Sequence, residues 1–285
     1  MTPVQLPALN HTPTIGVFDS GFGGLTVLRA LVERIPQAHY AFLGDTARLP
    51  YGSKSRRTIA RYAVESARFL VHEQGAELLV IACNTASALA LDAIEDAVPV
   101  PVLGVIGPGA TAAAAASQTR DVLVIATDAT VQSHAYASAC QAHGLRALEK
   151  SCPLLVPLVE EGLTTHTVTE QVIDVYLNEL RAQASAAGLT PDALVLGCTH
   201  YPLLRPLIER AVRAGVRVID SAESTAQAAL AEFGAHLGGL PAAVSAAAAP
   251  ELHFFATDSI EKFERLGSRF LGRPVERVNL LDLGG

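Results

Sequence analysis

Basic residues are scarce in this sequence, and no run of them occurs. Its 21 Lys and Arg residues are outnumbered by 28 Asp and Glu residues, which gives a net charge of −7. Nucleic acids and anionic membranes bind clusters of positive charge, so we expect neither as a partner. The apolar stretches are all interrupted within a few residues. A transmembrane helix needs about 20 consecutive apolar residues, so none is predicted.

The sequence also lacks a targeting signal and a disulfide framework. Segment 1–13 contains three prolines and no Lys or Arg, unlike a secretory or transit peptide, and we expect it to be a loose tail. Four cysteines among 285 residues are too few for a disulfide scaffold. We therefore expect a reduced, cytoplasmic protein. The Gly-, Ala- and Pro-rich segment 238–251 predicts a flexible surface loop.

A glycine-rich loop follows the first apolar strand, 14–18, but it lacks a nucleotide fingerprint. After Gly21 and Gly23, the third glycine of a G-x-G-x-x-G motif would fall at Thr26, and there is no P-loop lysine. Phosphate binding by this loop is an alternative, and we expect no cofactor. The loop does offer a carboxylate, Asp19, and a hydroxyl, Ser20, beside free backbone N–H groups.

Two cysteines follow short apolar strands in separate halves of the chain. Cys83 comes after the predicted strand 77–82, and Cys198 comes after the predicted strand 193–197. They are 115 residues apart (198 minus 83), much too far for a local metal or redox motif, and we expect no metal. In open parallel sheets, ligands bind at the carboxyl ends of strands. The pattern therefore predicts one site with a sulfur on each side.

The order of elements repeats along the chain. Asp19 precedes Cys83 by 64 residues, and Thr127, which follows the predicted strand 121–126, precedes Cys198 by 71. This predicts an α/β fold of two similar domains, each a mostly parallel sheet flanked by helices, related by a pseudo-two-fold axis with the active site in the cleft between them. We place the first domain at 14–106 plus 220–285 and the second at 107–219. A strand at 252–256 and a helix at 259–271 are expected to return to the first domain.

Two thiols at one site favour a particular chemistry. One cysteine paired with His200 would suit a single-cysteine hydrolase or transferase, but such a mechanism gives the second thiol no role. Two bases on opposite faces of one carbon can remove a proton from one side and return it to the other, which inverts a stereocentre without a cofactor. A two-lobed module that only binds an acidic ligand is a further alternative.

Four motifs together resemble the cofactor-independent aspartate/glutamate racemase family, and within it the glutamate racemases. They begin at Val17, Leu49, Ala82 and Leu196 and read VFDSGFGG, LPYG, ACNTA and LGCTHYP. The resemblance implies that Cys83 and Cys198 are the acid/base catalysts and that D-glutamate is supplied for peptidoglycan. It also implies that Asp19 assists Cys83, whereas His200 and Glu160 assist Cys198. The implied substrate-binding residues are Asp19, Ser20, Tyr51, Gly52, Asn84, Thr85, Thr199 and His200.

Two residue roles and the substrate have alternatives in the sequence. Glu160 is favoured over Glu161 from its place in the sequence, and Tyr51 could contribute through its backbone alone. An aspartate or hydantoin racemase is the nearest alternative function. Cys140 and Cys152 are expected to be structural, because buried cysteine commonly acts as a small hydrophobic residue. We expect a homodimer with glutamate as its small-molecule partner. The short tail does not favour activation by a cell-wall precursor.

Overall fold

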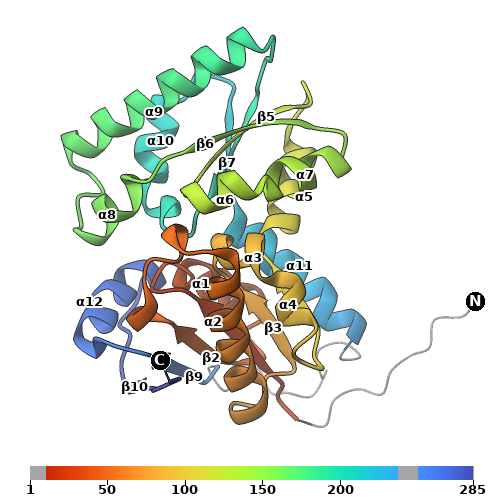
Figure 1. The fold of residues 1–285 in the computed structure, drawn as a ribbon, viewed down its shortest axis with the longest axis vertical. Helices are drawn as coiled ribbons and strands as arrows, with labels where there is room; N and C mark the ends of the chain where they lie inside the picture. The colour runs from red at the N-terminus through yellow and green to blue at the C-terminus, as the bar shows by residue number, and fades with distance from the viewer. Residues whose placement is uncertain (1–10, 237–249, 285) are drawn as a thin grey trace, which may run out of the picture.

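The computed structural model describes residues 11–236 and 250–284. Most of the predicted tail and nearly all of the predicted 238–251 loop lie outside these residues. Figure 1 shows two lobes, each built on its own sheet. Within the described ranges, no helix combines the length and hydrophobicity needed to span a bilayer.

The first lobe contains a sheet with the strand order β10-β9-β2-β1-β3-β4, and all of its pairings are parallel. The expected strand at 252–256 does return to this sheet, where it pairs with β2. Pro99 and Pro101 place the strand expected over 100–105 near a sheet edge or a crossover, and the structure has it at the sheet edge. The strands are β1 (Thr14–Asp19), β2 (His39–Gly44), β3 (Leu78–Ile81), β4 (Val102–Gly104), β9 (Leu252–Ala256) and β10 (Val278–Leu280).

The second lobe repeats the central part of this arrangement. Its parallel sheet has the order β6-β5-β7-β8, which matches β2-β1-β3-β4 strand for strand. The strands are β5 (Asp121–Ala126), β6 (Arg146–Ser151), β7 (Ala193–Gly197) and β8 (Arg217–Asp220). The predicted fold class, with two similar parallel sheets, is therefore confirmed. The exact domain boundaries stay a prediction.

Helices cover the sheets, and α11 packs against helices of both lobes, α1 and α5. The helices are α1 (Leu25–Arg34), α2 (Arg56–Arg68), α3 (Asn84–Leu89), α4 (Leu91–Glu95), α5 (Ile106–Ala116), α6 (Asp128–Ser133), α7 (Ala135–Ala142), α8 (Leu155–Glu160), α9 (Thr167–Ala186), α10 (Arg205–Ala211), α11 (Ser221–His236) and α12 (Ile260–Leu271). Short 3₁₀ turns span Thr46–Arg48, Tyr51–Ser53 and Tyr201–Leu204, and a π turn spans Phe69–Glu73.

The sequence predicts single helices over 84–97, 55–74 and 203–214, and the structure differs from each of these. The helix expected over 84–97 is interrupted at Ala90 and forms α3 and α4. The helix expected over 55–74 changes to a π turn after Arg68. The helix expected over 203–214 begins as a 3₁₀ turn, because Pro202 and Pro206 lack the N–H groups that a longer α-helix would use.

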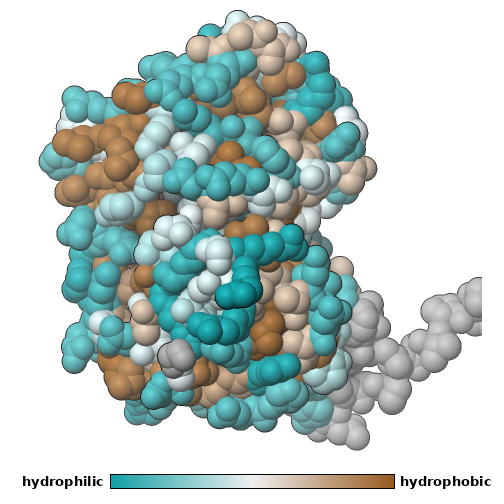
Figure 2. Space-filling model, viewed as in Figure 1, coloured by the Kyte–Doolittle hydropathy of each residue, from teal (hydrophilic) through white to brown (hydrophobic). Residues whose placement is uncertain are grey.

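The strands that carry the site are fully buried. Every residue of β3, β5 and β7 is buried, which is typical of parallel sheets covered on both faces and explains their continuous apolar sequences. Cys140 and Cys152 are 0% exposed in the core. Figure 2 shows that apolar side chains also reach the surface on the left of the second lobe, over α8 and α9, a region where Leu154, Val168 and Val175 are exposed.

Candidate active site

The first lobe presents a thiol, a hydroxyl and a carboxylate at the ends of two paired strands. Asp19 ends β1, and its Oδ2 accepts a hydrogen bond from the N–H of Gly21 at 2.8 Å. Cys83 follows β3 as the N-cap of α3, where its sulfur accepts from the N–H of Ala86 at 3.4 Å. The Cys83 thiol also donates to Oγ of Ser20 at 3.4 Å. Parallel pairing of β1 with β3 thus brings the predicted groups to one sheet edge.

The second lobe surrounds its thiol with a chain of charged groups. Cys198 follows β7, and its Sγ lies 4.0 Å from Nδ1 of His200. Nε2 of His200 lies 3.3 Å from Oε1 of Glu160. The other oxygen of Glu160 accepts from Nζ of Lys262 at 3.4 Å, and this lysine comes from α12 of the first lobe. Glu160, favoured over Glu161 from the sequence, is therefore the glutamate that contacts His200.

Both thiols face one cleft of about 430 Å³, a volume usual for small-molecule sites. Cys83 is 5% exposed and Cys198 6%. The cleft is lined by ten of the predicted site residues: Ser20, Tyr51, Gly52, Cys83, Asn84, Thr85, Glu160, Cys198, Thr199 and His200. Asp19 is buried behind this lining and accepts from Oγ1 of Thr199 at 3.5 Å.

The environment of Cys83 favours the neutral thiol. Burial raises the pKa of Cys83 to about 12, and the nearby charge of Asp19 adds to this effect. The hydrogen bonds that Cys83 shares with Ser20 and Ala86 oppose the increase only in part. Burial also raises the pKa of Asp19, while the positive charge of His200 counteracts the shift. At neutral pH, Cys83 is therefore suited to donate a proton.

The environment of Cys198 differs because it contains a cationic imidazole. Burial lowers the pKa of His200, but its contacts with Cys198 and Glu160 outweigh burial and raise this pKa to about 10. His200 is consequently an imidazolium at neutral pH, 4.0 Å from the Cys198 sulfur. Burial raises the pKa of Glu160, but His200 and Lys262 outweigh it and lower that pKa overall. Glu160 therefore remains a carboxylate that can orient the imidazolium.

Neutral donors on the first lobe are available for an anionic ligand. Oδ1 of Asn84 accepts from the hydroxyl of Tyr136 at 2.7 Å. Its Nδ2 is buried and has no hydrogen-bond partner within the described part of the chain. A buried donor without a partner costs free energy, and a substrate carboxylate would satisfy it.

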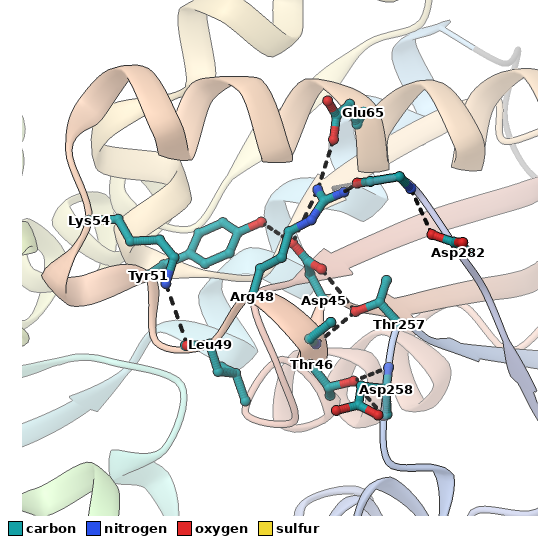
Figure 3. Close-up of polar contacts among 12 residues, drawn as sticks. Asp45, Thr46, Arg48, Leu49, Tyr51, Lys54, Glu65, Thr257, Asp258 and Asp282 are labelled. Carbon is teal, nitrogen blue, oxygen red and sulfur yellow. Dashed lines mark hydrogen bonds and ion pairs between the residues drawn. The ribbon is translucent and has the colours of Figure 1, made fainter.

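Tyr51 contributes to the cleft differently from the other predicted binding residues. Its hydroxyl donates to Oδ2 of Asp45 at 2.5 Å, and Figure 3 shows this bond within a larger polar cluster. Because the hydroxyl is already engaged, the backbone of Tyr51 and Gly52 is the part left to bind a ligand. This agrees with the backbone role considered from the sequence.

Thr127 and Lys262 are two of the polar cleft residues that the site prediction missed. Thr127 lines the cleft, and its Oγ1 lies 3.1 Å from Oγ1 of Thr85. The repeat could have identified it, because Thr127 follows β5 as Asp19 ends β1. Lys262 lines the cleft from α12, but no motif surrounds it in the sequence.

The glycine loop has a role other than phosphate binding. A Cβ atom at Gly23 would lie 2.2 Å from Oγ1 of Thr199 and 2.6 Å from Nδ1 of His200. Both distances are impossible for real side chains, so glycine is required for the two lobes to approach. Nearby, the Thr26 hydroxyl donates to the Thr199 carbonyl at 3.3 Å. The loop therefore fixes the contact between the lobes beside the cleft.

Comparisons with known proteins agree with this geometry. The family model for Asp/Glu/Hydantoin racemase matches residues 15–229. The chain is 54% identical to the glutamate racemase of Koribacter versatilis, with 96% of this chain and 98% of the relative covered. A crystal structure of the Francisella tularensis glutamate racemase in complex with D-glutamate superposes with a TM-score of 0.84 at 33% identity, covering 96% and 99%.

The Thermus thermophilus glutamate racemase in complex with beta-chloro-D-alanine superposes with a TM-score of 0.81 at 41% identity, covering 95% of this chain and 97% of that one. Matches of this extent cover nearly the whole chain, and they confirm the resemblance inferred from the four motifs. The chain belongs to the Asp/Glu/Hydantoin racemase family.

Proposed function

We propose that this protein interconverts L- and D-glutamate without a cofactor, with one of Cys83 and Cys198 removing the Cα proton and the other donating a proton to the opposite face. The observation that carries the proposal is the presence of both thiols in one cleft of about 430 Å³. The names of the relatives support glutamate as the substrate. The catalytic and binding roles of the individual residues are part of the proposal.

For L-glutamate, the Cys198 thiolate is the base. Its sulfur takes the proton from Cα, the electron pair stays on carbon, and the Cys83 thiol donates its proton to the opposite face. D-glutamate leaves with Cys83 as thiolate and Cys198 as thiol, and solvent exchange restores the starting state. The reverse reaction uses Cys83 as the base. His200 stabilises the Cys198 thiolate by charge, and Glu160 orients His200.

The carbanion must be stabilised by fixed dipoles, because a Cα proton is only weakly acidic. Closing the cleft removes water and strengthens the interaction of these dipoles with developing negative charge. The substrate carboxylates would be bound by Ser20, Asn84 and Thr85 on the first lobe and by Thr199 on the second. Lys262 is paired with Glu160 at 3.4 Å, so its charge is largely neutralised. This avoids excessive stabilisation of the bound substrate.

The test uses dialysed protein and L-glutamate in D₂O, without pyridoxal phosphate. Optical rotation should decay to zero while the Cα proton is replaced by deuterium. Activity that returned only on adding pyridoxal phosphate would contradict the proposal. Aspartate and a hydantoin serve as competing substrates, and faster turnover of either one would identify the alternative racemase. A single-cysteine hydrolase or a binding module would leave the optical rotation unchanged.

We also propose a cellular role for this protein. Production of D-glutamate for peptidoglycan follows from the family resemblance, as do a cytoplasmic location and a homodimer. The structure describes four free cysteines, which suits a reducing compartment.

Sedimentation velocity at several protein concentrations would test the dimer. Limited proteolysis would test the proposed domains, because cuts should cluster near residues 106 and 220.

A further inference from the structure

We propose that Asp45 is a positioning residue, which fixes the backbone of Tyr51 and Gly52 for substrate binding. The inference rests on the proposed function, because it assigns a role toward the same glutamate site. Asp45 immediately follows β2 and is 0% exposed. It does not line the cleft, so it acts through Tyr51 rather than on the substrate.

The side chain of Asp45 joins two segments that are distant in the sequence. Its Oδ2 accepts from the Tyr51 hydroxyl at 2.5 Å, and its Oδ1 accepts from the Thr257 hydroxyl at 2.9 Å. Thr257 follows β9 and also accepts from the N–H of Ala47 at 2.9 Å. Figure 3 shows Asp45 between these partners. The Asp45 carboxylate therefore connects the 3₁₀ turn Tyr51–Ser53 to the segment between β9 and α12.

Arg48 adds a second attachment to the same turn. Its Nη1 lies 2.8 Å from Oε2 of Glu65 on α2 and 3.7 Å from Oδ2 of Asp45. Its Nη2 donates to the carbonyl of Gly284 at 2.6 Å. The guanidinium also lies over the Tyr62 ring, 4.3 Å from its centroid. These contacts hold the 45–53 segment against both α2 and the C-terminal end of the described chain.

The cluster acts on the cleft through the direction of the Tyr51 side chain. Tyr51 is 1% exposed, and its ring packs on Phe18 with centroids 6.2 Å apart. With the ring and hydroxyl held, the adjoining backbone of Gly52 is fixed opposite Thr127, where a Cβ atom would lie 3.5 Å from the threonine. A substrate group bound by this backbone meets donors that are already in place, which lowers the entropic cost of binding.

The experiment compares Asp45→Asn, Tyr51→Phe and their double variant with wild type in glutamate racemisation. Each single variant should raise KM about tenfold and change kcat less than about threefold, because it weakens binding of substrate and transition state alike. Asp45→Asn removes the charge from the Tyr51–Asp45 hydrogen bond and Tyr51→Phe removes its donor, so the double variant should resemble the single ones rather than multiply their effects.

Tyr40→Phe is the matched control. Tyr40 is 0% exposed, and its hydroxyl donates to the carbonyls of Leu31 and Ile35 at 2.9 and 2.7 Å. It therefore loses a buried phenolic hydroxyl at a different place in the first lobe. Thermal unfolding should show comparable destabilisation of Tyr40→Phe and Tyr51→Phe, with KM unchanged only in Tyr40→Phe.

The outcomes separate this inference from the proposed function. Wild-type protein that fails to racemise glutamate would refute the function. Active wild type with an unchanged KM in folded Asp45→Asn and Tyr51→Phe would refute only the positioning role. An equal KM increase in Tyr40→Phe would reduce the effect to lost stability. If Asp45→Asn does not fold, the comparison of Tyr51→Phe with Tyr40→Phe decides the question.

Discussion

The two lobes share a scaffold but treat their cysteines differently. The two sheets have matching strand orders. Cys83 follows β3, which pairs with β1, and Cys198 follows β7, which pairs with β5. In the first lobe, burial and the charge of Asp19 raise the pKa of Cys83 to about 12. In the second lobe, His200 faces Cys198 and is itself held by Glu160. The scaffold therefore sets where the thiols lie, whereas neighbouring side chains give the two thiols different electrostatic surroundings.

The largest expected effect comes from removing either thiol. Cys83→Ser and Cys198→Ser should each reduce racemisation in both directions by about 10³-fold, because serine is a much weaker acid. An analogue that loses a leaving group after proton abstraction separates the two faces. Cys83→Ser should eliminate only from the L form and Cys198→Ser only from the D form, as measured by product release.

Elimination is needed for this comparison because the two glutamate enantiomers have equal free energy. Every variant must then have the same kcat/KM in both directions, whichever thiol it has lost. Cys140→Ser and Cys152→Ser are controls, since both cysteines are 0% exposed in the core. Equal elimination from both enantiomers by either active-site variant would show that a single base serves both faces.

The pH dependence should distinguish the two thiols next. The pKa of His200 is raised to about 10, so its positive charge persists at neutral pH and disappears as the pH rises through 10. Elimination from the L form should therefore change little up to about pH 10. Elimination from the D form should rise, because the pKa of Cys83 is about 12. The measurement is the L-to-D rate ratio between pH 7 and 11.

His200→Asn sharpens this test. The variant should slow elimination from the L form by about 10- to 100-fold at pH 7 and make its rate rise with pH as the unassisted thiol ionises, with a smaller effect on the D form. A ratio that did not vary with pH in wild type would contradict the assignment of His200 to Cys198.

A smaller effect is expected from Lys262, which connects the first lobe to the acid/base groups of the second. Its ion pair with Glu160 spans 3.4 Å, and the lysine side chain is 44% exposed. Such pairs contribute up to about 1 kcal/mol. Lys262→Met should therefore slow elimination from the L form at most about fivefold, with Lys262→Arg close to wild type. A matching decrease for the D form would indicate a general effect on the cleft.

The smallest effect concerns the free energy of unfolding. The pKa of Asp192 in the second lobe is lowered, whereas the pKa of Asp19 in the first lobe is raised. Burial raises the pKa of Asp192, but hydrogen bonds from Ser117 and Gln118 outweigh it and lower that pKa from 3.8 to about 2. Its stabilisation is present above pH 3.8 and disappears as the pH falls toward 2. Asp192→Asn should cost about 1 kcal/mol at pH 7, and this difference from wild type should vanish near pH 2.

Asp19→Asn should show the opposite trend. Burial raises the pKa of Asp19, so ionisation of the wild-type residue costs stability as the pH rises. Urea unfolding of both variants across this range is the measurement. Parallel pH profiles for the two variants would contradict the difference between the lobes.

Sequence patterns predicted the parts of the molecule that depend on local order. Apolar strands ending at Cys83 and Cys198 could be located, and the repeat indicated two sheets. The edge strand β6 was missed, because it contains Arg146, Glu149 and Lys150 and its first residue is exposed. The short strand β10 was also missed.

Contacts between distant segments could not be predicted from local patterns. Asp45 and Thr257 are 212 residues apart, and Lys262 and Glu160 are 102 apart. Neither pair has a sequence spacing with physical meaning. Thr127 is the exception, because applying the repeat to the binding residues would have placed it in the site.

The matching strand orders have a consequence for the origin of the molecule. If two separate copies of one lobe had formed the cleft around a two-fold axis, every side chain at one thiol would recur at the other. Here, the second residue after Cys83 is Thr85, and the second residue after Cys198 is His200. Joining both lobes in one chain allows each half to change without its twin, so the surroundings of Cys83 and Cys198 can differ although the scaffold repeats.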